Sequence, residues 1–212
     1  MPTSDPHVRA LVGLDLVAAG RPGLTVLEAR RTVVVISRSR RPDREIFLDR
    51  CAADDVPVIV RPSGGGAVVL SPGVVVANLV TDRSAGHSMP DDCFRCFGAC
   101  AVASLGALGV TGITMRGVCD LCLGQRKVAG TALRLWRGLV LYQLSLLVDP
   151  DPGLPERYLP HPSREPDYRR GRGHGEFLTS LAEVGCNIAA GEIETALRKS
   201  FLPFVSGRFP QY

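Results

Sequence analysis

No stretch of this 212-residue chain is both long and apolar enough to cross a lipid bilayer. The longest nearly apolar run, residues 138–148, contains Tyr142, Gln143 and Ser145 and falls well short of the roughly 20 residues that a spanning helix needs. A secretory signal is also missing, because Asp15 interrupts the only apolar stretch near the N-terminus and no clear cleavage site follows it. We therefore expect a cytoplasmic protein that does not associate with a membrane.

The chain also lacks the even set of cysteines that a disulfide framework requires. It has seven, and without a signal peptide we expect them to be reduced thiols. They are Cys51, Cys93, Cys96, Cys100, Cys119, Cys122 and Cys186.

Lysine is scarce, since only Lys127 and Lys199 occur among 25 basic residues. Arginine supplies almost all of the positive charge, and the formal net charge is +4 at pH 7. A modest charge spread along the chain argues mildly for an acidic partner and only weakly for nucleic acid. A lysine in such a composition indicates a position that needs a compact ammonium on a flexible stem, which a planar guanidinium cannot replace.

The length and a hydrophobic content of 45% suit one globular domain, so we expect residues 1–212 to form a single domain. Hydrophobic periodicity predicts several strands and helices along it. The expected strands lie within residues 24–37 and at 56–60, 67–70, 74–81, 121–123, 127–135 and 139–148, and the expected helices at 43–54, 89–109, 177–184 and 190–201. Residues 149–175 are dense in Pro, Arg and Gly and are predicted to be irregular.

A run of three glycines follows Arg61-Pro62-Ser63 between two of the expected strands. Without Cβ atoms, the backbone of Gly64, Gly65 and Gly66 can lie against an extended ligand and direct N–H groups at an anion. Taken alone, such a run is more often a turn than a binding site.

A second feature surrounds Lys127 in the segment GQRKVAGTA, residues 124–132. The small residues Ala129, Gly130 and Ala132 leave room for a bound chain. An ammonium beside that chain can polarise an acyl carbonyl or stabilise an acyl phosphate. A solvated surface lysine is the commoner interpretation when nothing else is known, because lysines are mostly exposed.

Together, RPSGGGAV (residues 61–68) and the segment around Lys127 resemble the motifs of the lipoate-protein ligase and octanoyltransferase family, within the biotin and lipoate ligase superfamily. The matching positions are Arg61, Ser63, Gly64, Gly65, Gly66, Ala67 and Val68 in the first motif, and Asp120, Leu121, Lys127, Val128, Ala129, Gly130 and Ala132 in the second. The resemblance implies an α/β (α+β) fold with a mixed, largely antiparallel sheet flanked by helices.

The resemblance also implies a reaction. A ligase of this kind uses ATP and Mg²⁺ to convert lipoate or octanoate to an acyl-adenylate, and then transfers the acyl group to a lysine of an acidic lipoyl carrier domain. That carrier belongs to a 2-oxoacid dehydrogenase subunit or is a protein of the glycine cleavage H type. Lys127 is the implied catalytic residue, and the implied adenylate-binding residues are Arg61, Ser63, Gly64, Gly65, Gly66, Ala67, Val68, Asp120, Val128, Gly130, Thr131 and Ala132.

Two further partner interpretations follow. We expect no counterpart of the small C-terminal accessory domain of the long ligases in this chain, so an accessory subunit is a candidate partner. The arginine-rich segment 161–174 is a candidate docking surface for the acidic carrier.

Two departures from the family pattern leave alternatives open. Val60 stands where the first of two arginines is usual, and Val118-Cys119 replaces Arg-Asn before Asp120. One alternative is an ATP-independent octanoyl or lipoyl transferase that forms a thioester on Cys119, since a thiolate near Lys127 would be activated by its charge. The other is a catalytically degenerate, lipoyl-binding partner subunit.

The cysteine spacing allows one more alternative. Cys93-x-x-Cys96 and Cys119-x-x-Cys122 could supply four thiolates to a zinc ion. However, Cys93, Cys96 and Cys100 are spaced as on one side of a helix, where buried thiols also fit. We therefore expect no metal site.

Overall fold

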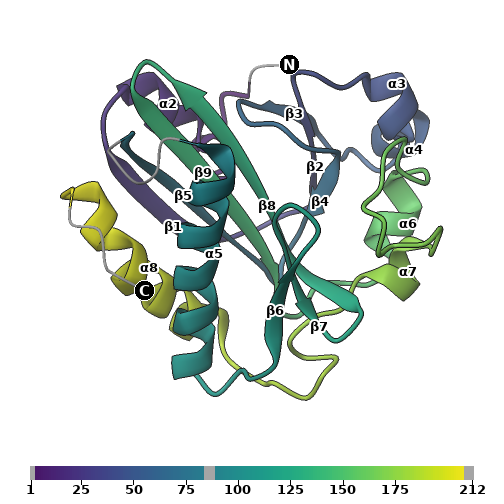
Figure 1. The fold of residues 1–212 in the computed structure, drawn as a ribbon. Helices are drawn as coiled ribbons and strands as arrows, with labels where there is room; N and C mark the ends of the chain where they lie inside the picture. Colours follow the sequence, from purple (N-terminus) through teal and green to yellow (C-terminus); the bar gives the residue numbers. More distant parts are fainter. Residues whose placement is uncertain (1–2, 84–88, 208–212) are drawn as a thin grey trace.

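A six-stranded antiparallel sheet forms the centre of the fold, in the order β1-β5-β9-β8-β7-β6 (Figure 1). The structure is a computed structural model and describes residues 3–83 and 89–207. The strands are β1 (Gly23–Glu28), β5 (Val74–Asp82), β6 (Ile113–Arg116), β7 (Asp120–Leu123), β8 (Arg126–Trp136) and β9 (Leu139–Leu147). Arg137 and Gly138 join β8 to β9 with φ values of 45° and 78°, and positive φ at both positions is what a tight two-residue hairpin turn requires.

Two long helices, α5 (Pro90–Ala107) and α8 (Ala190–Val205), cover one face of this sheet (Figure 1). Pro90 and two aspartates start α5, and its buried residues recur every three or four positions, as one face of a helix does. Phe97 of α5 lies 5.2 Å from the ring of Tyr142 on β9 and 5.1 Å from that of Phe204 on α8. These contacts form the centre of the main hydrophobic core.

A second, three-stranded sheet lies against the opposite face, in the order β3-β2-β4. Its strands are β2 (Val33–Ser37), β3 (Val58–Arg61) and β4 (Val68–Leu70), with β2 parallel to β3 and antiparallel to β4. Val35 and Leu70 pack with Val74 and Val76 of β5, so the two sheets share a core. The short helices are α1 (Pro6–Leu11), α2 (Leu14–Ala19), α3 (Pro42–Glu45), α4 (Leu48–Ala53), α6 (Leu154–Tyr158) and α7 (His174–Phe177).

The mixed, largely antiparallel architecture confirms the fold class expected from the sequence. The helix expected at residues 177–184 is wrong. The backbone N–H of Thr179 donates to Lys127, and those of Leu181 and Ala182 donate to Leu147 and Val148. These amides therefore bind the ends of β8 and β9 and are not available for helical bonds.

The expectation that residues 149–175 are irregular is also wrong in part. Helix α6 begins inside this segment, where Pro155 occupies one of the first helical positions and its missing N–H costs nothing. The expected helix at residues 43–54 is two short helices, α3 and α4. Helices α1 and α2 and strand β6 have no counterpart among the elements expected from the sequence.

None of the helices in the described parts of the chain is long and apolar enough to cross a membrane.

Asp54 ties α6 to the end of α4 and makes part of the stability dependent on pH. Arg157 donates to both carboxylate oxygens at 2.6 and 2.7 Å, and the Tyr158 hydroxyl donates at 2.8 Å. The bonds from Arg157 and then Tyr158 hold the pKa of Asp54 at about 2, below its ordinary 3.8. Because the folded-state pKa is lowered, this stabilisation is complete above pH 4 and is lost as the pH falls towards 2. We expect Asp54→Asn to remove that component, which thermal unfolding between pH 2 and 5 would measure against the native chain.

Candidate active site

A cavity of about 320 Å³ lies between the two sheets. Most of its lining residues are apolar and a smaller number are polar or charged, which is the usual character of a site for a small organic ligand. The apolar lining includes Leu11, Val12, Val35, Val68, Leu70, Val76, Leu144 and Leu147, and the polar lining includes Glu45, Arg61, Asp120, Lys127, Gln143, Arg164, Arg169 and His174.

Arg61, at the end of β3, holds the glycine loop in shape. Its side chain is 7% exposed, and Nη2 donates to the carbonyl oxygens of Gly64 and Gly66 at 2.7 Å each. Nε donates to Ser63 Oγ and to Gly64 O, both at 3.1 Å. Burial lowers the pKa of Arg61 to about 10, so the guanidinium is still charged at pH 7. The guanidinium of Arg61, which the resemblance implied would bind the adenylate, is directed at the loop's own carbonyls.

Gly65 has the one positive φ in the glycine run, +97°. A Cβ there would lie 2.7 Å from Arg61 Nη2, so this position needs glycine both for its backbone conformation and for space. Gly65, Gly66, Ala67 and Val68 line the cavity.

Ser63 connects the glycine loop to the large sheet. It is 3% exposed, and its hydroxyl donates to Gln143 Oε1 on β9. Gln143 Nε2 donates to Val12 O at 3.1 Å and to Asn78 Oδ1 at 2.5 Å. Ser63 thus supports the loop from its buried side, while Gln143, which lies outside both sequence motifs, lines the cavity itself.

Lys127 and Asp120 form an ion pair in the cavity wall. Asp120 begins β7 and Lys127 lies near the start of β8, and the antiparallel pairing of these strands brings the two side chains together. Lys127 Nζ lies 2.7 Å from Asp120 Oδ1, and the side chains are 23% and 14% exposed. The ammonium is therefore held in a fixed place while part of it still faces the cavity.

Gly130 makes room for this lysine. A Cβ at position 130 would lie 3.1 Å from both Cε and Nζ of Lys127. Gly130, Thr131 and Ala132 all line the cavity. Val128 does not, because its side chain is fully buried in the main core.

Cys119 lies in the cavity wall beside Thr131. Its Sγ donates to Thr131 O at 3.6 Å, and Thr131 Oγ1 donates back to Cys119 O at 2.8 Å. Burial raises the pKa of the thiol, and this outweighs the opposing effect of Lys127. A protonated thiol at neutral pH is a poor nucleophile.

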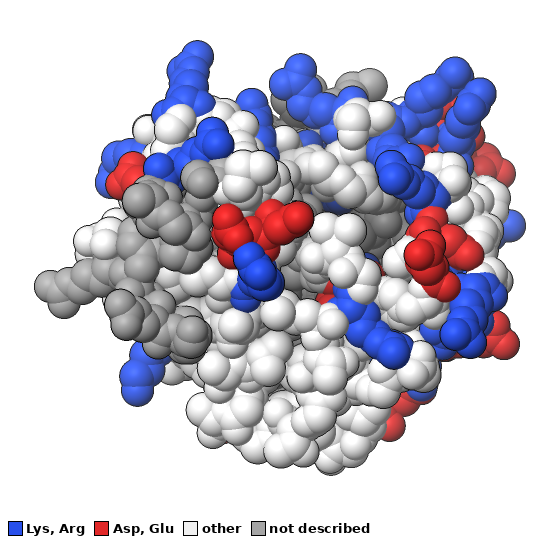
Figure 2. Space-filling view, viewed as in Figure 1, with Lys and Arg blue, Asp and Glu red and all other residues white. Residues whose placement is uncertain are grey.

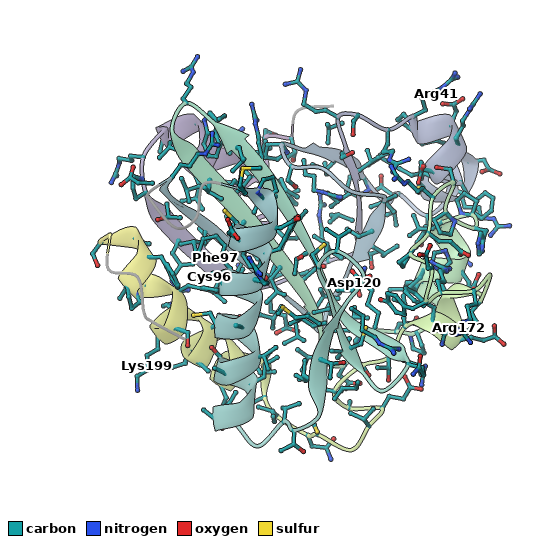
Figure 3. The ribbon with its side chains drawn as sticks, in the orientation of Figure 1. Arg41, Cys96, Phe97, Asp120, Arg172 and Lys199 are labelled. Carbon is teal, nitrogen blue, oxygen red and sulfur yellow. The ribbon has the colours of Figure 1, made fainter. Side chains whose placement is uncertain are left out.

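The cysteine pairs of the zinc alternative belong to different places. Cys93 and Cys96 lie on α5, whereas Cys119 directly precedes β7 and Cys122 belongs to it. Figure 3 labels Cys96 on α5 and Asp120, the first residue of β7. No group of three or more His, Cys, Asp or Glu side chains that could hold a metal ion occurs in residues 3–83 and 89–207. Cys93 and Cys122 are fully buried, as core thiols often are.

The arginine-rich segment, expected to be a surface loop, also forms one wall of the cavity. Glu45 of α3 accepts a bond from Ser163, and Arg164, Arg169 and His174 line the same cavity. Arg169 is 4% exposed. Figure 2 shows Lys and Arg side chains gathered along the upper and right-hand edges of the visible face, where α3 and this segment lie.

Comparisons with known proteins agree on one family. Residues 14–202 match the model of the lipoyl protein ligase A/B catalytic domain. A lipoate–protein ligase of Streptococcus pyogenes serotype M5 (strain Manfredo) is 36% identical over 97 residues, which is 45% of this chain and 27% of that protein. A putative lipoate-protein ligase A of Aeropyrum pernix is 28% identical over 119 residues, which is 56% of this chain and 44% of that protein. The matches thus span less than half of these relatives.

Solved structures show the same fold at low sequence identity. A lipoate-protein ligase A bound with ATP has a TM-score of 0.76 and 19% identity, covering 95% of this chain and 81% of that one. One chain of a bipartite lipoate protein ligase from Thermoplasma acidophilum, solved in a study of an archaeal lipoylation system with its E2 lipoyl domain, has a TM-score of 0.76 and 18% identity. This match covers 94% of this chain and 79% of that one.

Proposed function

Because the chain belongs to the lipoyl protein ligase A/B catalytic domain family, we propose that it is an ATP-dependent ligase for lipoate or octanoate. The observation that carries the proposal is the position of Lys127. Its ammonium lies in the wall of a largely apolar cavity, paired with Asp120, and the glycine loop forms another part of the same wall.

The cavity suits each part of an acyl-adenylate. Its apolar interior can hold the acyl chain, and the glycine loop has no Cβ to obstruct the adjoining carboxyl and phosphate. In the first step a carboxylate oxygen of the acid attacks the α-phosphorus of ATP, and pyrophosphate leaves with the electrons of the broken P–O bond. A fixed ammonium stabilises the negative charge that this reaction concentrates near the phosphoryl oxygens.

The second step transfers the acyl group to a lysine. The neutral amine of the acceptor attacks the carbonyl carbon, the C–O bond to AMP breaks, and the amine loses its proton to solvent. We propose that Lys127 also polarises this carbonyl, and that Asp120 holds Lys127 in place. Arg61 and Ser63 maintain the loop, while Gly65–Val68, Gly130, Thr131 and Ala132 form the wall against which the adenylate lies.

ATP needs a divalent cation, and the donors around the cavity fit Mg²⁺ carried by the nucleotide. Mg²⁺ usually keeps several waters and binds one or two carboxylates together with substrate phosphates. Among the described lining residues the carboxylates are Glu45 and Asp120, which also contact Ser163 and Lys127. The cation would neutralise phosphate charge there.

For the acceptor we propose an acidic lipoyl carrier domain of the 2-oxoacid dehydrogenase or glycine cleavage H type. The support is the arginine-rich segment 161–174, whose Arg164 and Arg170 are exposed, and the E2 lipoyl domain studied with one structural neighbour. That neighbour is also described as bipartite, which supports an accessory subunit as a further partner. We propose residues 1–212 as the catalytic domain of this system.

Mass spectrometry of an apo lipoyl domain tests the proposal. The domain is incubated with the protein, Mg-ATP and either lipoate or octanoate, and separately with an acyl-carrier donor and no ATP. Acylation of the acceptor that requires ATP and free acid supports the ligase. Transfer from the acylated carrier without ATP would show that the thioester alternative is correct, and no acylation under either condition would favour a degenerate binding subunit.

Cys119→Ser separates the ligase from the thioester mechanism within one protein. We expect it to retain ATP-dependent acylation within about threefold, because the thiol bonds to Thr131 O and its pKa is raised by burial. Serine also keeps a donor for that bond. Initial rates of acceptor acylation measure the effect, and a loss of more than 100-fold would show that the sulfur takes part in the reaction.

A further inference from the structure

Tyr168 connects the arginine-rich segment to the lysine of the site. Its hydroxyl donates to Asp120 Oδ2 at 2.8 Å, while the other oxygen of the same carboxylate, Oδ1, lies 2.7 Å from Lys127 Nζ. We propose that Tyr168 is a positioning residue that fixes Asp120 and, through it, the ammonium of Lys127. This inference rests on the proposed function and adds to it a residue from outside both sequence motifs.

The direction of each hydrogen bond in this chain of contacts is determined. An ionised carboxylate only accepts, so the phenol proton must point at Asp120. Cys122 Sγ, 3.3 Å from the phenol oxygen, donates to it from the other side. With one oxygen bonded to Tyr168 and the other to Lys127, the carboxylate of Asp120 cannot turn about its side-chain torsions without breaking a bond.

The ring of Tyr168 is held independently of its hydroxyl. It lies 5.3 Å from the ring of Phe177, and the guanidinium of Arg116 sits 5.5 Å from its centroid. Gly117, with a φ of +57°, brings the β6–β7 turn close to the same ring. Phenylalanine should therefore occupy the same place, so the hydroxyl can be removed without moving the segment.

Tyr168 does not itself line the cavity, unlike Lys127 and Asp120. Its effect on the reaction must therefore pass through Asp120, and this predicts how kcat and KM respond when the hydroxyl is removed. Holding Lys127 in place matters when charge develops in the reaction, more than when substrate binds. We expect Tyr168→Phe to lower kcat for acid-dependent pyrophosphate release about tenfold, with the KM values for acid and ATP within twofold of the native values.

Tyr158→Phe is the matched control. It also removes a tyrosine hydroxyl that donates to a carboxylate at 2.8 Å, that of Asp54, and Tyr158 is not among the cavity-lining residues. We expect it to leave kcat within twofold. An equal loss of kcat in both variants would show that any such bond matters only for stability, and would overturn the positioning role.

A double-mutant cycle with Asp120→Asn tests the route of the effect. If Tyr168 acts through Asp120, adding Tyr168→Phe to Asp120→Asn should change kcat by less than twofold. A full further tenfold loss in the double variant, or a rise in KM at unchanged kcat, would contradict the proposal. No acid-dependent pyrophosphate release by the native chain would instead contradict the proposed function.

Chemical labelling of lysines tests the positioning role of Tyr168 even if the native chain releases no pyrophosphate. An amine-acylating reagent modifies Lys127 and Lys199, the two lysines of the chain, and Lys199 is an exposed internal reference on α8. In Tyr168→Phe we expect labelling of Lys127 relative to Lys199 to increase at least threefold, because its carboxylate partner is less constrained. An unchanged ratio would show that the hydroxyl does not hold the pair.

Discussion

Replacement of Lys127 by alanine is expected to reduce acid-dependent pyrophosphate release by about 100- to 1000-fold, the usual cost of removing one preorganised charge from a reacting site. The ammonium is fixed by Asp120 at 2.7 Å and lies in a partly buried wall, where a charge acts more strongly than in water. Alanine also leaves Asp120 without its cation, which adds negative charge beside the anionic substrates. Release of pyrophosphate from Mg-ATP in the presence of octanoate measures the loss.

Lys199→Ala is the control for this experiment, since it removes the other lysine of the chain at an exposed position of α8 (Figure 3). It should leave the rate unchanged. Lys127→Arg tests geometry, because it keeps the charge but replaces the ammonium by a planar fork that the space over Gly130 does not suit. Activity above one tenth of the native value in Lys127→Ala would mean that the lysine is not the main electrophilic group.

The parts of the fold that could be predicted from the sequence are those whose signal is local. Strand β5 is a β-branched run that is buried over almost its whole length, and α5 repeats its buried residues at helical spacing. Residues 177–184 show the limit of that approach. Their hydrophobic spacing suits a helix, but their amides bind β8 and β9, and these partners are set by the tertiary fold.

In the candidate site, too, only residues within local motifs could be predicted from the sequence. Lys127 and the glycine loop carry recognisable motifs, whereas Tyr168 reaches Asp120 across 48 residues of sequence and has no local pattern to mark it. Strand alternation does not determine the place of Val128, because the β7–β8 register shifts beside it and both Val128 and Ala129 are buried in the main core. The role of Arg61 could not be inferred, since a guanidinium can donate equally well to a phosphate or to nearby carbonyls.

Because Arg61 supports the glycine loop through backbone carbonyls, the loop should be sensitive to a single methyl group at position 65. In Gly65→Ala the added Cβ would lie 2.7 Å from Arg61 Nη2 and would displace it from the carbonyls of Gly64 and Gly66. Losing hydrogen bonds from a buried charge costs about 1.5–3 kcal/mol, and the positive φ costs a further 1–2 kcal/mol or so. We expect the variant to be about 3–4 kcal/mol less stable by these increments, and the distorted loop to lower acid activation about 100-fold.

Gly112→Ala is the control that separates the steric clash with Arg61 from the backbone strain of a positive φ. Gly112 also has a positive φ, +77°, but a Cβ there would meet no atom within 4 Å, and the residue does not line the cavity. It should lose only about 1–2 kcal/mol, the cost of the strain, and keep its activity. Urea unfolding measures the stability of both variants, and pyrophosphate release measures their activity. Equal losses of stability would show that Arg61 moves aside without cost, and a stable but inactive Gly65→Ala would show that the methyl group blocks the substrate directly.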